Sequence, residues 1–104
     1  MPAYLLSFRL PRDSGSTPDL RAGWTAFFAA ISSHLEDLGN PVFERRSVGE
    51  TGAGTVLGGY TIVDAAGLEE AAALAARCPL IGRGGGVEVG ELTSLGVVAK
   101  LAPR

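Results

Sequence analysis

The sequence predicts one α+β domain, residues 1–104, whose elements follow the order strand, helix, strand, strand, helix, strand. Short apolar segments separated by turn residues indicate the strands. A stripe of apolar residues at helical spacing after Pro18 indicates the first helix, and an alanine-rich segment that stops at Cys78-Pro79 indicates the second. A chain of 104 residues is long enough for a single hydrophobic core.

The first strand and helix are expected at either end of a turn-rich loop. Apolar residues alternate over Ala3–Arg9, which is typical of a strand. Thr17 suits an N-cap and Pro18 the first helical position. Gly39 is expected to cap the end of this helix. The apolar stripe between these ends has helical spacing and consists of Leu20, Trp24, Phe27, Phe28, Ile31, Leu35 and Leu38.

The second and third strands are expected at Val42–Val48 and Val56–Val63. The adjacent Gly58 and Gly59 predict a bulge or a close approach of backbone within the third strand. Both faces of this strand are largely apolar, as expected for a strand buried on two sides. One face holds Tyr60 and Ile62, and the other holds Thr61 and Val63.

The second helix is expected between Gly67, a candidate cap, and Pro79, which cannot continue a helix. Its expected core face is mostly alanine, so the helix can lie close to the sheet; the face comprises Leu68, Ala71, Leu74, Ala75 and Cys78. A glycine-rich loop leads to a fourth strand at Val87–Thr93. The apolar run Val97–Leu101 is expected to add a short strand or to pack on a partner.

This order of elements is the ferredoxin-like split βαβ pattern, in which both helices cover one face of an antiparallel sheet. Hydrophobic residues make up 46% of the chain and charged residues only 19%. An apolar surplus in a small chain, together with the two apolar faces of the third strand, predicts that the helix-free face packs on another copy. We therefore expect a homodimer that forms an α/β barrel.

Composition argues against several functional classes. The net charge is -2 and Lys100 is the only lysine, which disfavours nucleic-acid binding. A single cysteine and a single histidine predict neither an internal disulfide nor a metal site, and no cofactor is expected. No apolar run reaches the roughly 18 residues that span a bilayer or resembles a signal peptide. The sequence thus predicts a soluble, cytoplasmic protein without membrane contacts.

His34 is the main candidate for catalysis. A histidine at the rim between helix and sheet can act as a general base near neutral pH, with Asp64 or Glu88 as its carboxylate partner. The alternative, which is favoured, is a half-buried residue near a helix C-terminus, where positive charge is stabilising. Glu88 is equally compatible with lining a cleft and with facing outward.

Other residues have a functional and a structural interpretation. Trp24 lies early enough on its helix to border an opening, although a core position is favoured; with Tyr60 and Glu88 it completes the candidate ligand-binding residues. Cys78 is a candidate nucleophile, but a helix C-terminus raises a thiol pKa, and a core role is favoured. The glycine-rich loop runs from helix to strand, so it lacks the helix N-terminus of a phosphate site.

The segment from Gly58 to Val89 resembles the YCII-related family, which includes the DGPF-domain branch. Members show Gly-Gly-Tyr, an acidic turn, a Glu- and Ala-rich helix, Cys-Pro or Asp-Pro, and Val-Glu-Val. The matching positions here are Gly58, Gly59, Tyr60, Asp64, Leu68–Arg77, Cys78, Pro79 and Val87–Val89. Two features depart from the pattern: GETGAGTV replaces the Asp-Gly-Pro-Phe signature, and Cys78 replaces the aspartate of Asp-Pro.

The resemblance implies a ferredoxin-like fold assembled as a dimeric α+β barrel, but it implies no single reaction. Some members of the family are proposed enzymes with a histidine and an aspartate in a cleft, and others are linked to sigma factors. Three hypotheses follow: a dimeric domain that binds a small molecule or protein, an enzyme that uses His34 as acid/base on a small, partly apolar substrate, and a regulator of transcription that acts through protein contacts.

Overall fold

The structure, a computed structural model, describes residues 1–13 and 17–93. The elements in chain order are β1 (Ala3–Pro11), α1 (Pro18–Ala30), the 3₁₀ helix η1 (Ser32–His34), β2 (Leu35–Pro41), β3 (Thr55–Asp64), α2 (Leu68–Ala75) and β4 (Gly86–Leu92).

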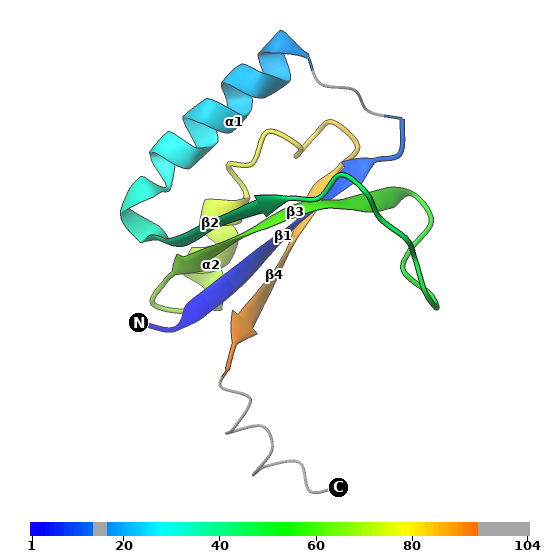
Figure 1. Cartoon of the computed structure of the whole chain (residues 1–104). Coiled ribbons are helices and arrows are strands. Elements are labelled where there is room, and N and C mark those ends of the chain that lie inside the picture. Colours follow the sequence, from blue (N-terminus) through cyan, green and yellow to red (C-terminus); the bar gives the residue numbers. More distant parts are fainter. Residues whose placement is uncertain (14–16, 94–104) are drawn as a thin grey trace, which may run out of the picture.

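The four strands form one antiparallel sheet in the order β2-β3-β1-β4 (Figure 1). Strands adjacent in sequence are separated in space wherever a helix intervenes, which gives the ferredoxin-like topology that the sequence predicts. The register of β1 and β3 shifts after Phe8, which pairs with Gly59, because Arg9 pairs with Leu57. Gly58 is therefore the extra residue of a bulge, as predicted from the glycine pair.

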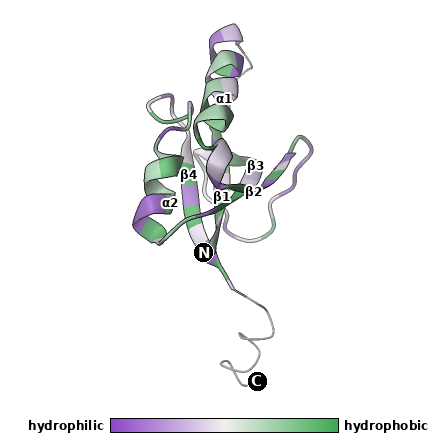
Figure 2. Ribbon diagram, turned by 90° about the vertical axis from the view of Figure 1, so that its left-hand side faces the viewer, coloured by the Kyte–Doolittle hydropathy of each residue, from purple (hydrophilic) through white to green (hydrophobic). Residues whose placement is uncertain are grey.

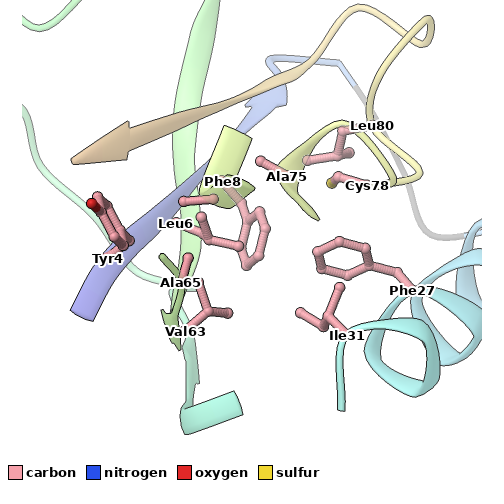
Figure 3. Packing of buried hydrophobic residues seen from close by; sticks show 11 residues of the cluster. Tyr4, Leu6, Phe8, Phe27, Ile31, Val63, Ala65, Ala75, Cys78 and Leu80 are labelled. Atoms are coloured by element: carbon pink, nitrogen blue, oxygen red, sulfur yellow. The ribbon is translucent and has the colours of Figure 1, made fainter. Parts of the chain in front are cut away.

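One face of the sheet and both helices enclose the core (Figure 3). Tyr4, Leu6 and Phe8 alternate along β1 and are all buried. The register places Thr61 and Val63 of β3 on the same face as these residues. Of the two faces that the sequence offered for β3, the one with Thr61 and Val63 therefore faces the helices, and the one with Tyr60 and Ile62 is helix-free. Phe27 and Ile31 approach this layer from α1, and Ala71, Ala75 and Cys78 approach it from α2 and the residues after it.

The two helices lie over different parts of the sheet, with α1 above α2 in both Figure 1 and Figure 2. Helix α1 begins as predicted, because the Thr17 hydroxyl accepts a hydrogen bond from the amide of Leu20 at 3.1 Å. Helix α2 has Gly67 as its N-cap and buries Ala71 and Ala75. These short side chains let α2 approach β4 and β1 more closely than α1 approaches any strand.

The predicted end of the first helix is wrong. Helix α1 stops at Ala30, and Leu35 and Leu38, which were expected on its apolar stripe, belong to β2. Pairing of β2 with β3 decides the conformation of this segment. Ser32 and Ser33 lie just before it and favour the end of the helix, because serine is a weaker helix former than alanine. Gly39 adopts a φ of 77° inside β2 instead of capping a helix.

The second strand is displaced for the same reason. The predicted strand Val42–Val48 is part of a connection between β2 and β3, while the true partner of β3 lies just before it. Leu68 also differs from its expected core position, since it is 57% exposed at the start of α2. The apolar run Val97–Leu101 lies outside the described residues.

The connection between β2 and β3, residues 42–54, projects from the sheet (Figure 2). Two arginines hold its C-terminal half. Arg9 donates to the Thr51 and Thr55 carbonyl oxygens, each at 3.1 Å, and Arg12 donates to the Ala53 carbonyl oxygen.

The helix-free face of the sheet carries both apolar and polar residues. Leu5 pairs with Ile62 at its centre, and both are half-buried in the single chain. Ser7 and Arg9 follow Leu5 on this face of β1, and Leu57, which pairs with Arg9, is 38% exposed on β3. Among the described helices, none is long and apolar enough to span a membrane.

Candidate ligand-binding pocket

A pocket of about 600 Å³ lies between α1 and the sheet. Its size is within the range of about 300–1,000 Å³ that is usual for small-molecule sites. Helix α1 contributes Leu20, Trp24 and Phe28, one helical turn apart, so the same face of the helix covers the pocket. Strand β1 contributes Phe8 and Leu10 from the buried face of the sheet.

Aromatic rings form one wall of the pocket. The ring of Trp24 is stacked on that of Phe28, with centroids 5.8 Å apart and planes at 22°. Phe8 meets Trp24 edge to face, with centroids 5.0 Å apart and planes at 78°. Phe27 contacts all three rings but is 2% exposed and belongs to the core. The cluster therefore joins the core on one side and faces the pocket on the other.

The opposite wall consists largely of backbone from β2 and β3. A Cβ on Gly39 would collide with the Tyr60 carbonyl oxygen, and one on Gly59 would lie 2.9 Å from the Asn40 carbonyl oxygen. The Thr61 hydroxyl donates to the Leu38 carbonyl oxygen at 2.8 Å and so fixes β2 against β3. Glycine at these positions keeps the two strands close and this wall smooth.

The pocket opens to solvent past two exposed apolar side chains. Leu38 is 59% exposed on β2, and Phe43 is 83% exposed at the start of the connection to β3. Asn40 and Tyr60 lie opposite one another in the β2–β3 register and also line the pocket. The Asn40 side-chain amide donates to the Tyr60 hydroxyl at 3.1 Å, so these polar groups bond to each other.

His34 and Asp64 lie together at another place in the molecule. The His34 Nδ1 atom is 3.0 Å from the Asp64 carbonyl oxygen and 3.6 Å from Asp64 Oδ1. The side chains are 27% and 34% exposed, respectively. Asp64 ends β3 and His34 ends η1, so the turn after α1 brings the two residues into contact. His34 does not line the pocket.

The structure thus separates the predicted site residues into three places. Trp24 and Tyr60 line the pocket, and His34 with Asp64 forms a separate pair. Glu88 is exposed on β4, opposite Ser7 of β1, on the helix-free face of the sheet. The structure therefore brings Trp24 and Tyr60 to one pocket and His34 beside Asp64, and the sequence did not show that these two pairs lie apart.

Cys78 has the core position that the sequence favours. It is 3% exposed, and burial raises the pKa of its thiol, although a backbone hydrogen bond with Leu80 partly offsets this effect. A buried thiol with a raised pKa is a poor nucleophile. Burial, and then the carboxylate of Glu91, also raise the pKa of Tyr4.

Several pocket residues escaped prediction. The helical stripe predicts Phe28 and Leu20 as core residues, but they line the pocket. An apolar stripe shows which face of a helix meets the sheet; it does not show where a space remains between them. Phe43 was assigned to a strand. Its isolation between proline, valine and charged residues was the only sequence signal of an exposed aromatic side chain. Among residues 1–13 and 17–93, no group of His, Cys, Asp and Glu is arranged to hold a metal ion.

Comparisons with known proteins support the fold. No family model matches the sequence, and no curated protein matches it. The structure is similar to that of 5-chloro-2-hydroxyhydroquinone dehydrochlorinase from Burkholderia phenoliruptrix AC1100, solved in complex with 2,5-dihydroxybenzoquinone. The TM-score is 0.56, the sequences are 17% identical, and the match covers 88% of this chain and 93% of that chain. The likeness supports a shared α+β fold of ferredoxin-like topology.

Proposed function

We propose that this protein binds a small, predominantly apolar molecule in the pocket between α1 and the sheet. The observation that carries the proposal is the pocket itself, which has a volume of about 600 Å³ and is enclosed by Trp24, Phe28, Phe8 and Leu20. Apolar pockets with a few polar groups are the usual sites of small-molecule binding. The dehydrochlorinase of similar fold was solved with a small cyclic ligand, which is compatible with such a use of this architecture.

A fragment screen followed by NMR tests the site. Trp24 is the only tryptophan of the chain, so its indole N–H gives a single resonance that reports on the pocket. We expect apolar fragments to shift this resonance and to raise the melting temperature. Leu20→Tyr, which adds a ring inside the pocket, should weaken binding about tenfold, equivalent to roughly 1.4 kcal/mol. Ala26→Tyr on the exposed side of α1 is the matched control. Equal binding by the two variants would place the ligand elsewhere.

We further propose that the chain is a distant YCII-related domain that works as a homodimer. The motif from Gly58 to Val89 and the ferredoxin-like topology support the family. The half-buried Leu5 and Ile62, with exposed Leu57 beside them, support a partner on the helix-free face. Burying apolar surface in the interface would drive this association, because each Å² removed from water stabilises the dimer by about 25 cal/mol.

Sedimentation equilibrium tests the dimer. We expect the unchanged protein to have twice the mass of one chain at micromolar concentration. Ile62→Glu should shift the equilibrium to monomer, because a carboxylate would be buried without a partner. Val48→Glu, at a residue that is 86% exposed, is the charge-matched control and should leave the mass unchanged. A monomeric unchanged protein would overturn the proposal.

A second candidate function is an enzyme in which His34 acts as acid or base on a small, partly apolar substrate. The contact between His34 and Asp64 favours it. With its Nδ1 proton donated to the Asp64 carbonyl oxygen, the imidazole would keep Nε2 as a base. The distance of 3.6 Å between Nδ1 and Asp64 Oδ1 is long for a hydrogen bond, so the carboxylate would act through charge.

Substitution separates the two functions. For any substrate found, His34→Gln should lower kcat by about 10²–10⁴-fold if His34 transfers the proton. Glu36→Gln, an exposed neighbour, should have no such effect. If His34→Gln changes neither turnover nor ligand binding, the catalytic role is excluded and the binding function is unaffected.

A further inference from the structure

The lining of the pocket lacks ionised groups. None of the lining residues in the described part of the chain is Asp, Glu, Lys, Arg or His. Of its polar residues, Thr61 donates its hydroxyl proton to the Leu38 carbonyl oxygen, and Asn40 donates to the hydroxyl of Tyr60, whose side chain alternation along β3 directs to the helix-free face. An ion that enters the pocket would lose water without gaining a charged partner, which costs far more than burying a neutral polar group.

The nearest cation on β1 cannot supply that partner. Arg9 lies between Phe8 and Leu10, which both line the pocket, and alternation along the strand directs it to the other face of the sheet. Its guanidinium is held by the carbonyl oxygens of Thr51 and Thr55 and by the Thr55 hydroxyl, the last at 3.1 Å. Swinging Arg9 into the pocket would break these hydrogen bonds.

The aromatic wall adds a preference for flat molecules. Trp24 and Phe28 are nearly parallel, at 22°, and Phe8 is nearly perpendicular to Trp24, at 78°. A planar ring can stack on one of these faces while its edge meets another. Such aromatic pairs gain about 0.5–1.5 kcal/mol beyond their apolar area. A saturated ring of the same size buries similar area but lacks this term.

We infer that the ligand of this pocket is a neutral, planar aromatic molecule, and that charged molecules with the same ring system are rejected. The inference rests on the proposed binding function and defines its ligand class. It follows from three observations: the lining is uncharged, hydrogen bonds hold Arg9 on the other face of the sheet, and the rings of Trp24, Phe28 and Phe8 are arranged to contact a flat molecule.

A panel of matched ring compounds tests it by calorimetry at neutral pH, with the Trp24 indole resonance to locate binding. The panel contains naphthol, naphthoate, naphthylmethylammonium and decahydronaphthol, which are neutral, anionic, cationic and saturated, respectively. We expect naphthol to bind and shift the resonance, and each of the others to bind at least roughly tenfold more weakly. Equal or tighter binding of either ion overturns neutrality, and equal binding of decahydronaphthol overturns planarity. Either of these outcomes leaves the proposed binding function intact. If no compound of the panel binds, the binding function and the inferred ligand class are both overturned.

A gain of function provides the sharper test. Leu38 lines the pocket but is 59% exposed, so Leu38→Arg introduces a cation at the opening with little loss of core packing. We expect naphthoate to bind about tenfold more tightly to this variant, through a charge-assisted hydrogen bond, with no gain for naphthol. Val48→Arg adds the same charge at an 86% exposed residue outside the pocket and should change neither affinity. If Leu38→Arg leaves naphthoate binding unchanged, the lack of a charged partner is not the cause of rejection and the inference fails.

Discussion

Helix α2 lies close against β4 and β1, whereas α1 stands farther from the sheet and leaves the pocket beneath the face that carries Leu20, Trp24 and Phe28. The difference follows from side-chain size. Helix α2 meets the sheet with Ala71 and Ala75, and α1 meets it with Trp24, Phe27 and Phe28. Large rings hold a helix away from a sheet, and Phe27 and Ile31 are buried in the space between, whereas Trp24 and Phe28 are half-buried. Two helices on one face of a sheet can therefore serve as core and as binding wall.

Removing the ring that fills the space under α1 should have the largest effect. Phe27→Ala should lower the free energy of unfolding by about 3–5 kcal/mol, because it opens a cavity in the core. Phe28→Ala, at the half-buried neighbour that faces the pocket, should cost less than half as much. Urea denaturation followed by circular dichroism measures both. Equal losses would mean that the side of α1 that faces the pocket is as tightly packed as the side that faces the core.

Enlarging the contact of α2 should have the next largest effect. Ala71 is fully buried, and Ala71→Leu should cost about 1–3 kcal/mol, because α2 has no space for a longer side chain. Ala73 is exposed on the same helix, so Ala73→Leu should change stability by less than about 0.5 kcal/mol. Thermal unfolding of the two variants gives the comparison. A tolerated Ala71→Leu would contradict the close approach of α2.

The buried thiol behind α2 predicts a dependence on alkaline pH. Burial raises the pKa of Cys78, so the folded chain keeps its proton where the unfolded chain loses it. The free energy of unfolding should be insensitive to this group below about pH 8.5 and should fall above it, by at most about 1.4 kcal/mol per pH unit. Cys78→Ala should flatten the decline between about pH 8.5 and 10 in urea titrations. An unchanged slope would assign the decline to other groups.

The start of α1 should contribute least. Thr17→Ala removes the hydroxyl that accepts from the Leu20 amide and should cost about 1 kcal/mol. Because Leu20, whose amide loses this hydrogen bond, lines the pocket, ligand affinity should fall as well. Thr25→Ala on the exposed side of α1 is the control, since its hydroxyl donates to the Arg21 carbonyl oxygen of its own helix. Loss of stability without loss of affinity would separate the helix start from the pocket.

The sequence predicts most of the fold because most elements have one consistent pattern. Alternation in β1, the glycine pair of β3 and the alanine face of α2 all match the structure. The segment after Ala30 has two patterns, since Leu35 and Leu38 continue a helical spacing and also suit a strand. Pairing with β3 decides between them, and such long-range contacts are not encoded in local spacing.

The candidate site was predicted only in part. Sequence indicated that Trp24 borders an opening and that Asp64 is a candidate partner for His34, and the structure places both residues accordingly. It could not show that the pocket and the pair are separate, because their distance depends on where α1 ends. A helix that continued to Leu38 would have carried His34 on the covering face, whereas the turn at Ile31 places it beside Asp64.

The pocket wall that contains Gly39 and Gly59 restricts which substitutions this protein can accept. A side chain at Gly39 or Gly59 would collide with the carbonyl oxygen of Tyr60 or Asn40, so substitution cannot readily reshape that half of the cavity. If the pocket binds the proposed ligand, changes in its selectivity should therefore come from the helix and from the opening. Libraries directed at Leu20, Phe28 and Leu38 should yield new selectivities, whereas libraries directed at the two glycines should yield mostly misfolded chains.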